Sequence, residues 1–175
     1  MTLASWQQLP LNLAVDFPSQ VGMDRLLNAV AAKHRVQREV PIIIIDAGSA
    51  VTVDWVDETG AFRGGAILPG FALMAQALHT YTALLPQVGV PPPVNPALPG
   101  TNTKAAIEAG IFWAVAGGIR ALIRQFVGLR STGRHPEVFL TGGDAHLLAT
   151  VLETTISLWP EMTLEGIRLA AEALP

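Results

Sequence analysis

The sequence predicts an α/β protein in which helices flank a mixed β-sheet, and three observations favour this class. Residues 42–45 are four consecutive isoleucines, which is typical of a central strand covered on both faces. Two strand-like stretches follow at residues 51–56 and 61–68, with the turn sequence DETG between them. Apolar residues at helical spacing precede and follow this block. Since helices and strands pack in layers around a shared core, we expect the helices to cover the sheet.

The N-terminal part is expected to hold an extended lead-in and then one helix. The lead-in reaches about Pro18, and the helix is expected to begin at Ser19 or Gly22. Its apolar positions recur at helical spacing, namely Leu26, Leu27, Val30 and Ala31. The sequence GMDR at residues 22–25 therefore lies at a helix entrance, where free backbone N–H groups favour an anion.

Two more helices are expected in the middle of the chain, on either side of a loop. Pro69 suits the first turn of a helix that we expect at about residues 70–84. The proline-rich residues 86–100 exclude helix and central strand, and they form a long loop. A long apolar helix is expected after this loop, with Thr101 or Asn102 as its N-cap.

The C-terminal part repeats the pattern of a strand that ends in a glycine turn. The stretch VFLTGGDA, which begins at Val138, predicts a strand, a Gly-Gly turn and the start of a helix. Residues 163–175 predict a terminal helix. A domain boundary is expected near Pro41, because three strands begin there and the pattern changes.

Composition excludes several classes of function. The net charge is -3 and no basic tract is present, so we expect no nucleic-acid partner. Cysteine is absent, and the four histidines lie far apart, which disfavours a zinc site. No run reaches the roughly 18 apolar residues of a membrane span, because Arg120 interrupts the most apolar stretch. With no recognisable signal sequence, we expect a cytoplasmic protein without a membrane partner.

One carboxylate, Asp46, ends the isoleucine strand directly before a glycine turn, in the sequence IIIIDAGSA. Backbone N–H groups of such turns bind phosphate, because the missing Cβ lets the anion approach. A carboxylate repels phosphate, so Asp46 would act through a bound cation or water. The alternative is that Asp46 caps its own turn by an Asx-type hydrogen bond.

Four segments resemble the type III pantothenate kinases, and they occur in the order of that family. They are residues 21–32, 45–86, 102–119 and 138–148. The resemblance implies a ribonuclease H-like, actin-like ATPase fold, in which residues 1–40 are a remnant of the N-terminal lobe and residues 41–175 form the C-terminal lobe. It also implies transfer of the ATP γ-phosphate to pantothenate in the presence of magnesium, which is the first step of coenzyme A biosynthesis.

The same resemblance implies roles at the predicted helix entrance. The family's Gly-x-Asp-Arg motif, which binds pantothenate, falls on Gly22, Met23, Asp24 and Arg25. Asp24 would be the general base that takes the proton of the pantothenate hydroxyl. Arg25 would pair with the pantothenate carboxylate or with phosphate. The alternative for this pair is an acid at a helix start beside an exposed arginine.

The acid–glycine turn also matches a family motif. Asp46 matches the residue that holds a monovalent cation, potassium or ammonium, in the family. Gly48 and Ser49 match the turn that binds ATP phosphate, where the family usually has a threonine after the glycine. Serine keeps the hydroxyl that touches ATP.

Two further positions and the assembly follow from the resemblance. Thr103 matches a threonine that contacts the substrate, although a simple helix cap is the alternative. Gly142 and Gly143 match the turn beside the adenosine, although a plain strand-to-helix turn is the alternative. The family is dimeric through the long helix, and a chain with 50% hydrophobic and only 14% charged residues suits a covered interface.

One departure from the family pattern affects the expected activity. The family begins with an Asp-x-Gly-Asn-Thr phosphate loop, whereas Asp16 is followed by Phe17 and Pro18. The chain thus resembles a family member without its first lobe. Because catalysis of phosphoryl transfer is mostly positioning and charge stabilisation, we expect weak or no kinase activity from this chain alone. Two alternatives stay open: a non-catalytic relative that serves as a transcriptional accessory protein, and another sugar or acetate kinase of the same superfamily.

Overall fold

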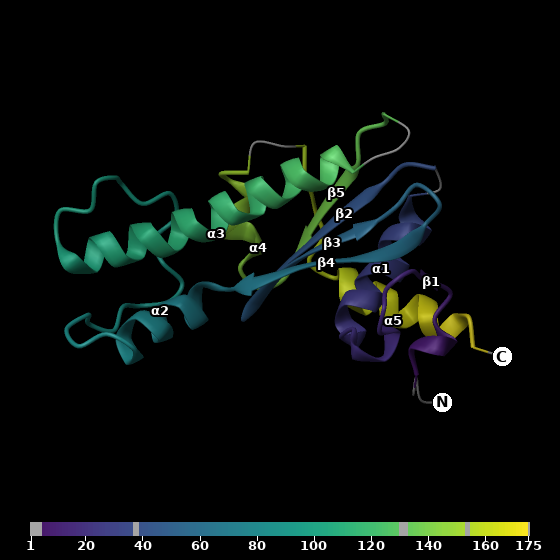
Figure 1. Cartoon of the computed structure of the whole chain (residues 1–175), viewed down its shortest axis with the longest axis horizontal. Helices are drawn as coiled ribbons and strands as arrows, with labels where there is room; N and C mark the ends of the chain where they lie inside the picture. Colours follow the sequence, from purple (N-terminus) through teal and green to yellow (C-terminus); the bar gives the residue numbers. More distant parts are fainter. Residues whose placement is uncertain (1–4, 37–38, 130–132, 153–154, 175) are drawn as a thin grey trace.

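The computed structural model describes residues 5–36, 39–129, 133–152 and 155–174, which form one sheet between two helical layers (Figure 1). The sheet has six strands in the order β1-β4-β3-β2-β5-β6. Their bounds are Asn12–Leu13 for β1, Ile42–Ala47 for β2, Ala50–Val56 for β3, Ala61–Pro69 for β4, Glu137–Thr141 for β5 and Ser157–Leu158 for β6.

The isoleucine strand β2 lies in the middle of this sheet. It pairs with β3 in antiparallel register, and β3 pairs with β4 in the same way. On its other side β2 pairs with β5 in parallel, and β6 follows in parallel to β5. A strand with neighbours on both sides and helices on both faces needs apolar side chains at every position. This mixed sheet flanked by helices confirms the predicted fold class.

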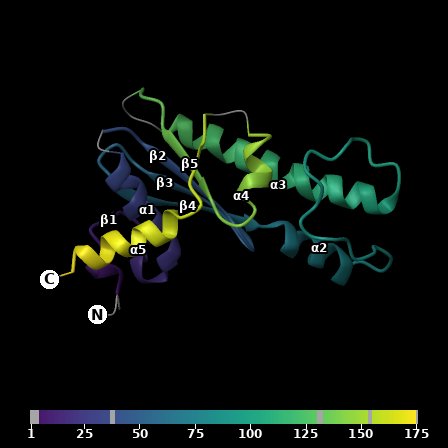
Figure 2. The same ribbon diagram turned by 180° about the vertical axis from the view of Figure 1, so that it is seen from behind.

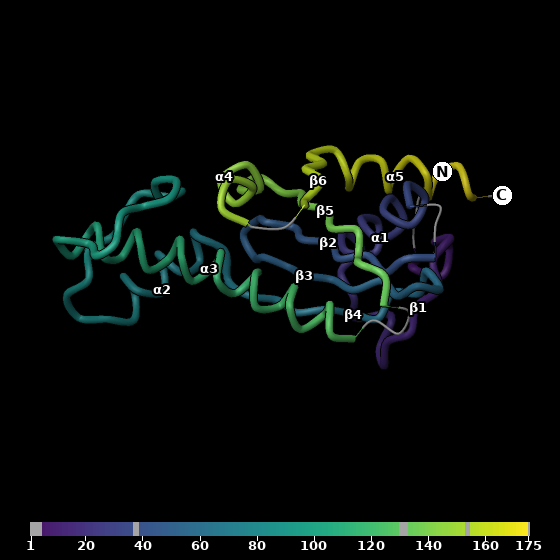
Figure 3. The backbone as a smooth tube through the Cα atoms, turned by 90° about the horizontal axis from the view of Figure 1, so that it is seen from above, coloured from purple at the N-terminus to yellow at the C-terminus, as the bar shows by residue number. Residues whose placement is uncertain are grey.

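One face of the sheet is covered by α3 (Thr103–Gly128) and the short α4 (Ala145–Ala149). Ile43 and Ile45 point into this layer, where they join one buried apolar cluster with Phe112 and Ile119 of α3. Figure 3 shows α3 running along the sheet and continuing beyond its end.

The opposite face is covered by α1 (Met23–Arg35) and α5 (Met162–Glu172), which lie side by side in Figure 2. Ile42 and Ile44 point into this second layer and are buried with Leu26 and Val30 of α1. Alternate residues of β2 therefore serve two separate cores, as the period of two along a strand requires.

The two helices of this layer approach closely at Gly166 of α5. A methyl group built on Gly166 would lie 2.1 Å from the carbonyl oxygen of Leu27, so no larger residue fits without movement of a helix. α1 is thus held between β2 and α5, and this contact fixes its position on the sheet.

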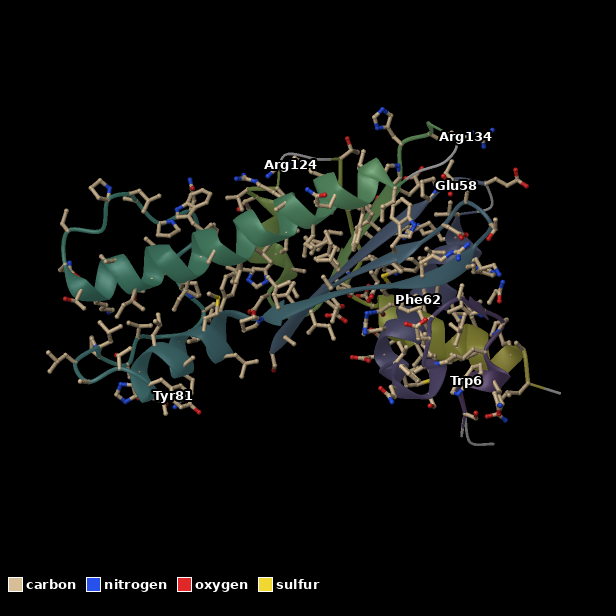
Figure 4. The ribbon with its side chains drawn as sticks, viewed as in Figure 1. Trp6, Glu58, Phe62, Tyr81, Arg124 and Arg134 are labelled. Atoms are coloured by element: carbon tan, nitrogen blue, oxygen red, sulfur yellow. The ribbon has the colours of Figure 1, made fainter. Side chains whose placement is uncertain are left out.

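The second helix differs from expectation at both ends. Pro69 is the last residue of β4, not the first turn of a helix, and Gly70 is the N-cap of α2 (Phe71–Thr80). Proline is tolerated at the end of β4 because β1 pairs only with the beginning of that strand. α2 ends at Thr80, and Tyr81 is exposed beyond it, as Figure 4 shows.

α3 matches the expected long helix, and the side chain of Asn102 caps it by accepting a hydrogen bond of 2.9 Å from the Ala105 N–H. By length and composition alone this helix could cross a membrane, contrary to our expectation that no segment would qualify. In its most apolar window 44% of the helix is buried within the fold. A core helix of a soluble protein meets the same criterion, so this is weak evidence for a membrane span.

We predict that Gly166→Ala lowers the free energy of unfolding by about 1–3 kcal/mol, because the added methyl group would separate α1 from α5. Gly117→Ala is the matched control, since nothing lies within 4 Å of a methyl group built on Gly117 in α3. That control should gain about 0.5–1 kcal/mol from the better helix propensity of alanine. Urea unfolding followed by circular dichroism measures both, and equal stability of the two variants would contradict the close approach.

Candidate functional site

The start of α1 lies over the carboxyl end of β2. Asn28 of α1 contacts Asp46 at the carboxyl end of β2, and the side chains of Leu26 and Val30 pack with Ile42 and Ile44 of that strand. Two motifs that are separate in the sequence, the helix entrance GMDR and the acid–glycine turn, therefore meet at one end of the sheet.

Asp24 is an exposed acid in the first turn of α1, whose N-cap is Gly22. Its carboxylate points back toward that cap, because a methyl group built on Gly22 would lie 2.5 Å from Asp24 Oδ1. A side chain at position 22 would therefore displace this carboxylate. Met23 is half-buried and packs against the apolar cluster beneath α1, so it supports the helix entrance.

Asp46, at the end of β2, accepts a hydrogen bond from α1. Asn28 Nδ2 donates to Asp46 Oδ2 at 3.0 Å, and Thr163 Oγ1 of α5 donates to Asn28 Oδ1 at 2.7 Å. The Thr163 hydroxyl thus fixes the orientation of the Asn28 amide, so that its NH₂ group faces Asp46. The hydrogen bond that the structure gives to Asp46 comes from Asn28 and not from the turn that follows, which disfavours the Asx-turn alternative.

The charged form of Asp46 is disfavoured by its surroundings. Burial raises the pKa of Asp46, the hydrogen bond from Asn28 lowers it, and the negative charge of Asp24 raises it again. The net pKa lies above the ordinary value. Asp24 and Asp46 therefore lie within electrostatic range of each other, and a cation between two such carboxylates would relieve their repulsion.

The turn at Gly48 and Ser49 is fixed by backbone contacts with two other turns. Gly70 N–H donates to Ser49 O at 3.0 Å, and a methyl group on Gly70 would lie 2.2 Å from Gly48 O. On the other side Gly142 has a positive φ of 96°, and a methyl group there would lie 2.4 Å from Ala47 O. Gly142 is thus required by the packing of the turn, whereas Ser49 is exposed to solvent.

A pocket of about 430 Å³ opens beside this turn. It is lined by Asp46, Thr141, Gly142, Gly143, Ala145, His146, Pro160 and Thr163. Nothing lies within 4 Å of a methyl group built on Gly143, so its backbone faces open space. The second glycine turn and the acid of the first turn therefore share one cavity.

Arg25 points into the sheet, in contrast to the alternative of an exposed arginine. Its guanidinium is paired with Asp54 of β3, whose side chain is 1% exposed. Arg25 Nε lies 3.1 Å from each carboxylate oxygen, and Nη2 donates to Oδ1. The pKa of Arg25 is raised above its ordinary value, because Asp54 accepts these hydrogen bonds.

Thr103 lies far from the other predicted site residues of the same chain. It is the first residue of α3, and Figure 1 shows this end of the helix at the opposite end of the molecule from α1. Thr103 lines a cleft of about 520 Å³ between α2 and α3 that is almost wholly apolar, with Leu73, Met74 and Ile107 among its walls.

Sequence reasoning missed three polar residues of the site, namely Asn28, Thr163 and Asp54. A signal existed for one of them, since Asn28 follows Asp24 by one helical turn and the two lie on one helix face. The alternation of β3 places Asp54 with Thr52 on the polar face of the strand, so its burial was not predictable from the sequence. Thr163 had no local signal, because its role depends on the contact between α5 and α1.

The donors at this site could hold a cation that other ligands complete, because the described residues form no chelating ligand set. Among the residues that the structure describes, no three His, Cys, Asp or Glu side chains come together as a metal ligand set. Asp46 Oδ2 accepts the hydrogen bond of Asn28, which leaves Oδ1 for a ligand. One carboxylate oxygen beside a phosphate-binding turn can share a cation with phosphate oxygens, as Mg²⁺ and K⁺ sites at substrate phosphates do.

Comparisons with known proteins agree on one family. The model of the type III pantothenate kinase family matches residues 1–125. The chain is 38% identical to the type III pantothenate kinase of Brevibacillus brevis over 162 residues, which are 93% of this chain and 61% of that protein. The enzyme named type III pantothenate kinase in Acidiphilium cryptum is 38% identical over 91% of the chain and 58% of that protein. The chain therefore spans about three fifths of the length of these relatives.

A solved structure described as a Baf family transcriptional activator from Campylobacter jejuni has the same fold. It superposes with a TM-score of 0.64 at 21% identity, over 95% of this chain and 69% of that chain. At this identity the likeness concerns the fold alone. The family match, in contrast, includes both the helix entrance at Asp24 and the acid–glycine turn at Asp46. The chain belongs to the type III pantothenate kinase family.

Proposed function

We propose that this chain binds pantothenate and ATP and provides the groups that transfer the γ-phosphate of ATP to the pantothenate hydroxyl. One observation supports this most strongly: Asp24 at the start of α1 lies within electrostatic range of Asp46 and its glycine turn, and Arg25 follows Asp24 directly. A base, a cation for a substrate carboxylate and a phosphate turn are the parts that this reaction needs. A cytoplasmic location is part of the same proposal.

Asp24 is the proposed general base. Its exposed carboxylate takes the proton of the substrate hydroxyl as the hydroxyl oxygen attacks the γ-phosphorus. A new O–P bond forms, the bond between the γ-phosphorus and the bridging oxygen breaks, and ADP leaves. The position of Asp24 in the first turn of α1 suits this role, because solvent and substrate both reach it.

The remaining residues bind and orient the substrates. Arg25 binds the pantothenate carboxylate, and the turn at Gly48 and Ser49 faces ATP phosphate. Asp46 would hold a monovalent cation, which supplies positive charge beside the phosphate oxygens, and magnesium would accompany ATP. The pocket beside Gly142 and Gly143 has room for the adenosine.

A homodimer is the proposed assembly, and it accounts for the remote position of Thr103. Thr103 cannot touch a pantothenate bound at Asp24 of its own chain, because α3 begins at the far end of the molecule (Figure 1). A second copy placed along α3 would bring Thr103 toward its neighbour's site. The part of the molecule formed by α2 and the first half of α3, here called the arm, exposes apolar residues at and after α2, Leu73, Tyr81 and Leu84 among them, which suit such an interface.

The expected rate of the isolated chain is low. The 175 residues contain one Asp-x-Gly turn, at Asp46, where the family uses two turns on the triphosphate. This observation also favours a second candidate function, that of a non-catalytic relative that serves as a transcriptional accessory protein. Detection of the product distinguishes the two.

We predict that Asp24→Asn lowers formation of phosphopantothenate at least about 10²-fold, because an amide cannot accept the proton. The reaction contains ATP, magnesium, pantothenate and either potassium or sodium, and mass spectrometry detects the product. Asp16→Asn, which changes an exposed acid of the lead-in, is the control. If the unchanged chain forms product, an equal amount from Asp24→Asn would exclude Asp24 as the base. Rapid turnover by the unchanged chain would refute the expectation of low activity.

We predict that Asn28→Ala raises the pKa of Asp46 further, because it removes the hydrogen bond that lowers this pKa. A cation needs the deprotonated carboxylate, so its binding should fail at a higher pH in the variant as the pH falls. NMR titration of the Asp46 carboxyl carbon measures the shift. Thr163→Val, which only frees the Asn28 amide to rotate, should give a smaller shift in the same direction. A lower or unchanged titration midpoint in Asn28→Ala would contradict the role of Asn28.

We predict that the unchanged chain is a dimer at micromolar concentration and that Leu73→Asp makes it monomeric, because a charge would be buried in the interface. Light scattering after size exclusion measures the mass. Leu164→Asp is the matched control, since Leu164 is an exposed leucine of α5, away from the arm. A monomeric unchanged chain would overturn the proposed assembly.

A further inference from the structure

Asp54 is a carboxylate in an unfavourable place. It lies on β3 opposite Ile44 of β2 and Gly65 of β4, on the face of the sheet that α1 and α5 cover. Asp54 is 1% exposed. Burial raises the pKa of Asp54 above its ordinary value, although the hydrogen bond from Arg25 lowers it in part. A buried carboxylate is retained at a position where an apolar residue would ordinarily be more stable, so a role beyond packing is expected.

The carboxylate of Asp54 holds one edge of the Arg25 guanidinium. Arg25 Nε lies 3.1 Å from both oxygens, and Nη2 donates to Oδ1. The ring of Phe62, which Figure 4 labels below the sheet, lies 5.7 Å from Arg25 Cζ and limits movement in a second direction. The contacts among the described residues leave Nη1 without a partner, and the Arg25 side chain is 14% exposed. The free end of the guanidinium is therefore the end that a ligand can reach.

Glycine at position 65 makes room for this arrangement. A methyl group built on Gly65 would lie 2.4 Å from Asp54 Oδ1 and 2.2 Å from Val53 O. Glycine weakens a strand interior, so its presence in β4 indicates a close approach that a side chain would prevent. Gly65, in the sequence AFRGGAIL, thus provides the space in which the carboxylate meets the arginine.

A buried ion pair is by itself weak evidence for stability, because desolvation offsets the attraction of the charges. Its specific effect is to fix geometry, since a carboxylate and a guanidinium meet in a planar arrangement. Arg25 follows Asp24 directly in the chain. When Asp54 holds Arg25 in place, the distance between the base Asp24 and an anion bound to Arg25 is therefore fixed as well.

We propose that Asp54 is a positioning residue, which holds Arg25 so that its free Nη1 end binds the carboxylate of the substrate at a set distance from Asp24. This inference rests on the proposed binding of pantothenate, and it adds Asp54, Gly65 and Phe62 to the residues that determine substrate specificity. Pantothenate without its carboxylate should bind no better to the unchanged chain than to a variant that lacks Asp54.

The test is a double-mutant cycle on pantothenate affinity, measured by isothermal titration calorimetry with magnesium, potassium and a non-hydrolysable ATP analogue present. Asp54→Asn should weaken pantothenate binding about 10-fold or more, and affinity for the ATP analogue should stay within about twofold. In the Arg25→Ala background, Asp54→Asn should have no further effect on pantothenate, because the residue through which it acts is gone. Additive losses, or tighter binding by Asp54→Asn, would overturn the inference.

Asp57→Asn is the matched control, because Asp57 forms another aspartate–arginine pair on this sheet, with Arg63 at 2.5 Å, and lies at the hairpin turn away from the site. Its pantothenate affinity should equal that of the unchanged chain. If Asp54→Asn does not fold, Arg25→Lys decides the question. Lysine keeps the charge but cannot form the planar pair, so unchanged affinity in Arg25→Lys would overturn the inference.

The same experiment separates failure of this inference from failure of the proposed function. No binding of pantothenate to the unchanged chain refutes the proposed function, and the inference falls with it. If the unchanged chain binds pantothenate and Asp54→Asn binds it with the same affinity, the proposed function stands and only the positioning role is refuted.

Discussion

The buried amide of Asn28 joins the three elements on which the site depends. It donates to Asp46 at the end of β2 and accepts from Thr163 at the start of α5, while its own backbone belongs to α1. The residue is 1% exposed, so a missing partner would leave a polar group buried without compensation. This constraint sets the rotation of α1 over the sheet. The same rotation turns Arg25 toward Asp54 and leaves Asp24 at the open end of the helix.

Stability and function make opposite demands on the face of the sheet that α1 and α5 cover. Most of the sheet carries apolar side chains on both faces, whereas the face of α1 and α5 carries Asp54 opposite Ile44 and, at the carboxyl end of β2, Asp46 opposite Thr141. Burial raises the pKa of both aspartates, which means that their charged forms are disfavoured by the fold. Such local violations of good packing are expected where binding and catalysis occur, because the site needs charges that the fold does not.

The arm formed by α2 and the first half of α3 has a different character from this site. It extends beyond the sheet, as Figure 3 shows. It also exposes large apolar side chains and encloses an almost wholly apolar cleft. A free chain in water would gain by covering such a surface. The dimer proposed above would cover it, and it would also join Thr103 to the groups around Asp24, so that assembly and substrate binding would depend on the same helix.

The sequence by itself determined the elements and the motif positions, and the tertiary structure decided what those motifs meet. The isoleucine run, the hairpin turn and the cap at Asn102 are local signals, so β2, β3, β4, α1 and α3 were predictable from spacing alone. The start of α2 was not predictable, because a free strand edge lets Pro69 end β4 instead of beginning the helix. Strand β6 was not predictable either, because a strand of two residues shows no periodicity. Asp24 and Asp46 were found through their motifs. The pairs Arg25–Asp54 and Asn28–Thr163 join residues 29 and 135 positions apart, and only the packing of helices on the sheet brings such residues within hydrogen-bonding distance.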